Sequence, residues 1–159
     1  HPSLYRFTPE ERFEEVLDSI DVLLENEVTD LQFFQMVSKV ESLVRESHFH
    51  IYPPEELMET ATRSSLFPFS VHVSDEKLLV KNSLSESYKD FVGLDILTIN
   101  GKSVASILDI IGNSAGLKSG FNNAALKNKL SHFNNLSMAY YFYVDTTSRF
   151  EIEYLNIIS

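Results

Sequence analysis

The chain has 159 residues, a hydrophobic content of 43% and a formal net charge of −10 at neutral pH. This size and composition allow one domain or two small ones with a real core, and the negative charge argues against nucleic acid and anionic lipid as partners. No apolar run approaches the roughly 18 residues of a membrane span. The absence of cysteine excludes disulfides and thiolate metal sites.

The acidic residues are unevenly placed. Nine carboxylates fall between Glu10 and Asp30 against one base, Arg12, which we interpret as a solvated helix face. The chain begins at His1 without an initiator methionine, so we expect it to be a processed or excised part of a longer protein.

The first fifty residues predict two amphipathic helices. Thr8 is expected to cap the first, with Glu11 completing a capping box, and apolar residues at helical spacing continue to about residue 26. Thr29 and Gln32 repeat the capping-box pattern before a second helix to about residue 46. The short connection predicts an antiparallel helical hairpin.

A short extended segment over 47–52 ends at Pro53-Pro54, where we place the boundary between an N-terminal helical domain (1–53) and a β-rich domain (54–159). The pattern then predicts a helix over 55–63 and a strand pair over 66–73 and 77–81.

A strand, a tight turn and a helix are expected in the stretch 92–104 and beyond. Asn100-Gly101 is a strong turn signal, and Ser103 can cap a helix that runs to Ile111. A further helix is expected to about Phe133, capped by Asn122 or Asn123, and then an aromatic strand over 138–144 and a closing strand over 150–154. The expected fold class is therefore α+β.

Two histidines and the aromatic run invite functional interpretations. His48 and His50 would share one face of a strand, but a metal site needs a further ligand such as His72, and no spacing supplies one. We therefore predict no metal and no cofactor. The aromatic run over 138–144 could form a carbohydrate or peptide platform, although core packing or contact with a neighbouring domain is the preferred interpretation.

Three stretches together resemble the front end of a carboxyl-terminal processing (tail-specific, tricorn-like) serine peptidase of the type found in Bacteroidetes. They are His1-Pro2-Ser3-Leu4-Tyr5, the helix end Leu43 to His48, and Phe67-Pro68-Phe69 with the stretch 93–104. The sequence departs from the family pattern at Ser47, which replaces a glycine, and at Leu94, which separates a glycine from an aspartate. The resemblance implies an N-terminal helical hairpin or bundle, then a PDZ-like small β-barrel with flanking helices, in the cell envelope or periplasm.

The resemblance also implies a catalytic serine and, about 25 residues later, a lysine that acts as general base, on a core that follows the PDZ-like module. Ser114 superficially fits the serine, but it follows a predicted helix, and Met138 and Ala139 stand where the lysine would be. We therefore expect no hydrolysis by this chain. The parent protein is expected to be a serine endopeptidase whose core continues beyond Ser159.

A PDZ-type module binds a peptide as an added strand and holds its terminal carboxylate with backbone N–H groups. The resemblance maps such a groove onto nine residues: Leu66, Phe67, Phe69, Val71, Val73, Val104, Ile107, Leu108 and Ile111. The carboxylate loop lacks glycine, and Pro68 has no N–H to donate. Selection of peptide C-termini and a spacer that positions the missing core therefore both remain open.

Two other functions are compatible with the sequence. The chain could be a stand-alone peptide-binding module, or its helical hairpin could form a homodimer. In the second case Phe13→Asp or Phe34→Asp would disrupt association if those side chains lie at the interface.

Overall fold

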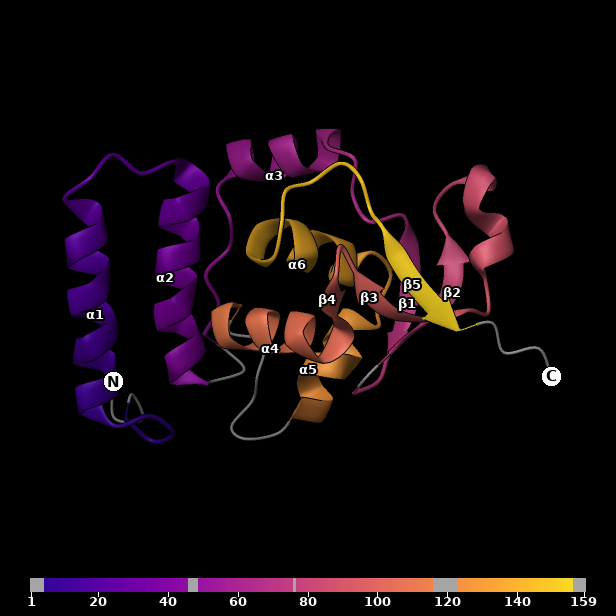
Figure 1. The fold of residues 1–159 in the computed structure, drawn as a ribbon. Helices are drawn as coiled ribbons and strands as arrows, with labels where there is room; N and C mark the ends of the chain where they lie inside the picture. Colours follow the sequence, from indigo (N-terminus) through magenta and orange to yellow (C-terminus); the bar gives the residue numbers. More distant parts are fainter. Residues whose placement is uncertain (1–4, 46–48, 76, 116–122, 156–159) are drawn as a thin grey trace.

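The computed structural model describes residues 5–45, 49–75, 77–115 and 123–155, and it is a mixed helix-and-sheet fold, as the predicted α+β class requires (Figure 1). The helices are α1 (Glu10–Leu24), α2 (Asp30–Val44), α3 (Glu55–Arg63), α4 (Val104–Ser114), α5 (Asn123–Leu130) and α6 (Asn135–Tyr143), with a 3-10 segment η1 (Glu86–Phe91). The strands are β1 (Phe69–Val73), β2 (Leu78–Ser83), β3 (Asp95–Ile99), β4 (Lys102–Ser103) and β5 (Ile152–Leu155).

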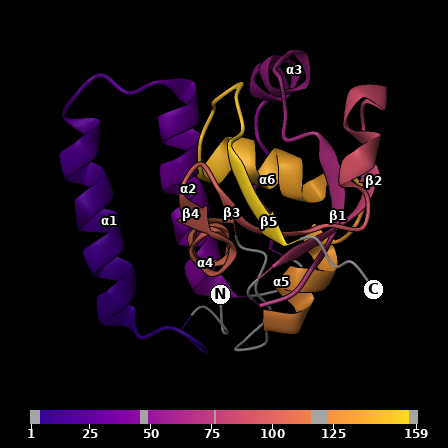
Figure 2. The ribbon, with the colours of Figure 1, turned by 45° about the vertical axis from the view of Figure 1, so that its right-hand side comes forward.

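The strands form one antiparallel sheet in the order β1-β2-β3-β4, with β5 also paired to β3. In the described part of the chain no pairing joins β1 to β4 or β5. The sheet is therefore open, and the closed barrel expected from the resemblance is not formed there. Helices α5 and α6 contact β1, and α4 contacts β3 and β4. Figures 1 and 2 show α1 farthest from the strands, with α2 between it and the rest.

Two helices, α1 and α2, form at the N-terminal end and contact each other, but only one of their two expected caps forms. The Thr29 hydroxyl accepts a hydrogen bond from the Gln32 backbone N–H (3.2 Å), and the Gln32 side chain accepts one from the Thr29 N–H (2.8 Å). The predicted Thr8 cap is wrong, because the Thr8 hydroxyl donates to the Leu43 carbonyl (2.7 Å) and α1 starts without a side-chain cap. Thr8 thus satisfies a carbonyl in the last turn of α2.

The core joins the sheet to α4, α5 and α6, and a second small cluster joins α2, α3 and α6 through Phe34, Ala61 and Phe142. Helix α2 also contacts α4 directly. Residues from both sides of the expected 53/54 boundary therefore share packing, and the two-domain division stays a prediction.

The aromatic stretch 138–144 is a helix, not the strand that its alternation predicted. Within α6, Tyr140 packs in the main core beside Phe67 (ring centroids 6.4 Å apart), whereas Phe142 packs against Phe34 (5.5 Å). A helix buried on more than one side carries apolar residues on several faces, so a short run of it resembles a buried strand. Residues 49–52, which were expected to be extended, form no ladder.

The Asn100-Gly101 turn forms as predicted, with φ of 50° at Asn100 and 72° at Gly101. Ser103 then caps α4 by accepting a hydrogen bond from the Ser106 N–H (3.2 Å). Asn100 also holds the chain before β5, because its side-chain oxygen accepts from the Glu151 N–H (2.8 Å). One local turn therefore positions both a helix and the closing strand.

Candidate functional site

The predicted groove residues lie mainly in the interior. Leu66 is partly exposed, and the other eight are buried in the main core: Phe67, Phe69, Val71, Val73, Val104, Ile107, Leu108 and Ile111. Their side chains pack with those of α5 and α6, including Leu126, Leu130 and Leu136. The structure thus brings them together as one packed cluster.

The outer edge of β1, where a peptide strand would be added, is partly occupied by side chains. The Val73 N–H donates to the Ser131 hydroxyl (2.9 Å), just after α5. The Ser137 hydroxyl, on α6, donates to the Phe67 carbonyl (2.7 Å) and lies 3.5 Å from the Phe69 carbonyl. These two serines engage backbone groups that an added strand would need. The sequence pattern does not predict these contacts, because they join residues 58 and 70 positions apart, and for Ser137 because a strand was expected over 138–144 in place of α6.

Ser114 is the last residue of α4. A helix C-terminus carries a partial negative charge, which opposes the oxyanion of an acyl-transfer reaction. Met138 and Ala139, at the position expected for a general-base lysine, lie in α6. Neither position supports a role for Ser114 as the catalytic serine.

His50 contacts a buried carboxylate. Its Nδ1 lies 3.2 Å from Oε1 of Glu41, a residue of α2 with little exposure. Burial raises the pKa of the Glu41 carboxyl, and hydrogen bonds from the Ile51 backbone and from His50 partly oppose that rise. His72 is exposed on β1, and His48 lies outside the described residues. Within the described ranges, no three potential metal ligands lie together.

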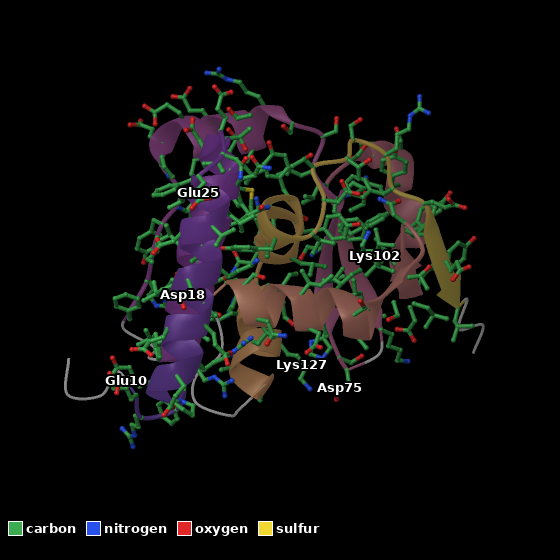
Figure 3. The ribbon with its side chains drawn as sticks, turned by 60° about the vertical axis from the view of Figure 1, so that its left-hand side comes forward. Glu10, Asp18, Glu25, Asp75, Lys102 and Lys127 are labelled. Atoms are coloured by element: carbon green, nitrogen blue, oxygen red, sulfur yellow. The ribbon has the colours of Figure 1, made fainter. Side chains whose placement is uncertain are left out.

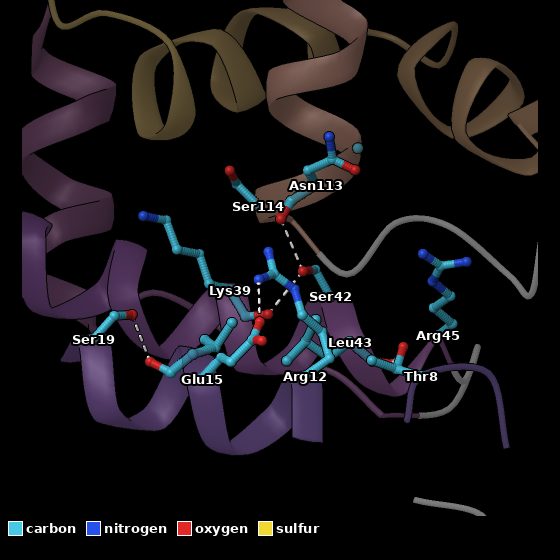
Figure 4. Close-up of a pocket in the computed structure, with 12 residues that line it drawn as sticks. Thr8, Arg12, Glu15, Ser19, Lys39, Ser42, Leu43, Arg45, Asn113 and Ser114 are labelled. Atoms are coloured by element: carbon cyan, nitrogen blue, oxygen red, sulfur yellow. Dashed lines mark hydrogen bonds and ion pairs between the residues drawn. The ribbon is translucent and has the colours of Figure 1, made fainter. Parts of the chain in front are cut away.

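A polar pocket of about 580 Å³ opens between α1, α2 and the end of α4 (Figure 4). Its wall consists of Thr8, Arg12, Glu15, Val16, Ser19, Lys39, Ser42, Leu43, Arg45, Gly112, Asn113 and Ser114. The Ser42 hydroxyl lies 2.8 Å from the Asn113 carbonyl and 2.7 Å from the Lys39 carbonyl, which ties α2 to α4 at this point.

The charge of this pocket is opposite to that of the surface around it. Arg12, Lys39 and Arg45 line it with one carboxylate, Glu15, whose Oε2 is 2.7 Å from Arg12 Nη1. Every acidic residue between positions 10 and 30 is exposed, as predicted, and Figure 3 shows three of them along the α1 hairpin side, at Glu10, Asp18 and Glu25. The pocket could not be predicted from the sequence, because Arg12 lies in α1 whereas Lys39 and Arg45 lie in or just after α2.

A second, apolar groove of about 320 Å³ lies between α2 and α3. Phe34, Ile51 and Leu57 belong to or pack against the small second cluster beneath it, while Tyr52 at its rim is 78% exposed. The groove adds to the exposed apolar surface of the hairpin side.

Comparison with protein-family models, with curated proteins and with solved structures found no match for this chain. No helix within the described ranges is long and apolar enough to span a bilayer.

Proposed function

We propose that this chain is a non-catalytic N-terminal segment of a tail-specific serine peptidase of the cell envelope, in which a PDZ-like module positions a Ser/Lys core. The support from the sequence is the order of the three stretches that resemble this family. The support from the fold is the β3, Asn100-Gly101, α4 unit, which has the strand, turn and capped helix of that resemblance.

The packing around β1 favours a positioning role over selection of peptides. Its inward side chains lie in the core, Ser131 accepts from the Val73 N–H of β1, and Ser137 donates to the Phe67 carbonyl just before β1. Strand addition would require these contacts to break and α5 and α6 to move, because both helices contact β1. A module packed in this way acts as a rigid spacer.

The test is a titration of the chain with hydrophobic peptides that carry either a free or an amidated C-terminus, together with a hydrolysis assay. We expect no carboxylate-dependent binding and no cleavage. The reading frame past Ser159 should encode a core with the serine and lysine. Binding that is lost on amidation, with NMR shifts along β1, would refute the spacer role, and a gene that ends at Ser159 would refute the peptidase origin.

Self-association through the helical hairpin is a second candidate, favoured by exposed apolar side chains on α1. Val22 is 63% exposed, and Leu17, Leu23 and Leu24 are also exposed. Phe13 and Phe34 are buried, so replacing them with aspartate would test folding and not an interface.

The test of self-association is the molar mass measured by light scattering over a range of concentrations. A mass that rises with concentration in the wild type and stays monomeric in Val22→Asp would support a dimer. Val92→Asp is the matched control, because Val92 is also an exposed valine and follows η1, outside α1 and α2. A monomer at all concentrations in the wild type would eliminate this candidate.

A further inference from the structure

Asn100-Gly101 is the one Asn-Gly pair in the sequence, and this dipeptide carries a chemistry of its own. A glycine that follows asparagine has no Cβ to hinder its backbone nitrogen, which can therefore attack the asparagine Cγ. A C–N bond forms, and the side-chain nitrogen leaves as ammonia with the proton that the glycine nitrogen gives up. Water then opens the resulting five-membered imide and leaves aspartate or isoaspartate. Water is the only co-reactant, so the reaction proceeds without an enzyme.

The folded structure holds the Asn100 amide at both of its polar atoms. Its oxygen accepts a hydrogen bond from the Glu151 N–H (2.8 Å), and its Nδ2 donates to the Arg149 carbonyl (3.2 Å). The Asn100 backbone N–H adds a third bond to this segment by donating to the Glu151 carbonyl (2.7 Å). Closing the imide ring turns the amide plane and expels Nδ2, so both side-chain bonds oppose it.

The other reacting residue, Gly101, is open to solvent. It is exposed, and beyond its chain neighbours no atom of the described residues lies within 4 Å of the position that a Cβ would take. Water therefore reaches the turn. The hydrogen bonds from residues 149–151, and not exclusion of water, are what protect Asn100.

Conversion of Asn100 would disrupt the same hydrogen bonds. An aspartate still accepts from the Glu151 N–H, but it has no donor for the Arg149 carbonyl, so two acceptor oxygens would face each other there. Isoaspartate also adds a methylene to the backbone of the turn between β3 and β4. Residues 149–151 lead directly into β5, which pairs with β3. Either product therefore weakens the docking of β5.

We propose that Asn100 is a deamidation site controlled by the docking of residues 149–155. While this segment is docked, its hydrogen bonds hold the amide and the asparagine persists. When the segment opens, Gly101 attacks, and the carboxylate product hinders redocking. Opening and modification thus promote each other, which makes the turn an irreversible switch of the closing strand. This site is independent of the proposed peptidase origin, since it rests only on the contacts and chemistry of the turn.

Mass spectrometry with peptide mapping tests the proposal on the whole chain, incubated at mildly alkaline pH either folded in buffer or unfolded in guanidinium chloride. Deamidation appears as the mass gain of replacing NH2 by OH in the peptide that contains residue 100. We expect Asn100 to react at least about tenfold more slowly in the folded chain, because the reaction then waits for local opening. Rates within about twofold of each other would overturn the proposal.

The variant Phe150→Leu tests whether the docked segment provides the protection. The Phe150 ring packs 5.4 Å from that of Phe67 and 5.8 Å from that of Tyr140, measured between centroids, and so anchors the segment in the core. A smaller side chain should raise the rate at Asn100 in the folded chain at least about threefold, because the segment opens more often. An unchanged rate would overturn the proposal.

The variant Asn100→Asp tests the effect of the product on β5. It should speed amide hydrogen exchange over residues 152–155 at least about tenfold relative to wild type, while exchange in α2 reports whether the fold is intact. Asn82→Asp is the matched control, because it makes the same change of charge at an exposed position of β2, and it should leave that exchange unchanged. Equal exchange over 152–155 in the two variants would overturn the proposal. If Asn100→Asp does not fold, the rates measured in wild type and Phe150→Leu decide.

Discussion

The variant Phe67→Ala tests whether Phe67 stabilises the core or binds a peptide. Phe67 is 1% exposed, and its ring lies 5.3 Å from that of Phe69 and 5.4 Å from that of Phe150, measured between centroids. Replacing such a side chain with alanine costs about 3–5 kcal/mol of unfolding free energy, because contacts are lost and a cavity remains. In a chain of this length each kcal/mol lowers Tm by about 2–4 °C, so Phe67→Ala should lower Tm by at least about 6 °C.

The assay is urea and thermal unfolding followed by circular dichroism, with Phe133→Ala as the control. Phe133 is 68% exposed, so its truncation should change the unfolding free energy by no more than about 0.5 kcal/mol. Phe67→Leu gives a smaller loss in the same direction if the alanine variant does not fold. A Tm for Phe67→Ala within about 2 °C of wild type, together with weaker peptide binding, would refute the assignment of Phe67 to the core.

Three further predictions address the β1 edge, the turn and the buried carboxylate. Ser137→Ala leaves the buried Phe67 carbonyl without its donor, so it should lower the free energy of unfolding by about 1–3 kcal/mol, measured in urea. An unchanged free energy of unfolding would contradict this contact. Gly101→Ala should cost about 1–2 kcal/mol because φ is +72°, whereas Gly101→Asn should cost less; equal stability of Gly101→Ala and wild type would contradict the turn. Burial raises the pKa of Glu41 in the folded state, so its contribution is greatest below the ordinary carboxyl pKa and is lost as pH rises through the raised value. The stability of wild type relative to Glu41→Gln should therefore fall as the pH rises above the ordinary carboxyl range, and a difference that does not change with pH would contradict this effect.

Local signals in the sequence predicted the parts of the fold that local chemistry determines. The Thr29 capping box, the Asn100-Gly101 turn and the Ser103 cap depend on residues at most three apart, and all three are confirmed. Thr8 failed as a cap because its partner, the Leu43 carbonyl, is 35 residues away. A capping pattern cannot show that a tertiary acceptor competes for the same hydroxyl.

The nature of the candidate sites could not be read from the sequence for the same reason. Apolar residues of β1 and α4 were placed near one another, but whether they line a groove or a core depends on what covers them. Helices α5 and α6 contact β1. The pattern over 138–144 predicts a strand there, so it does not predict that α6 packs on β1. The polar pocket likewise depends on α1, α2 and the end of α4 each contributing to one wall, which no local pattern in the sequence shows.

Helix α2 connects the N-terminal helix α1 to the rest of the fold. It contacts α1, α4 and α6, and Gln35 and Ser42 bond it to the rest of the fold: Gln35 donates to the Phe142 carbonyl at 2.7 Å, and the Ser42 hydroxyl lies 2.8 Å from the Asn113 carbonyl. Its 15 residues span about 22 Å, with the apolar groove near its start and the polar pocket near its end. Because side chains from both sides of Pro53-Pro54 meet along this helix, the hairpin and the sheet should move together. A partner docked on the hairpin would then be held in a defined orientation to the sheet, as a spacer requires.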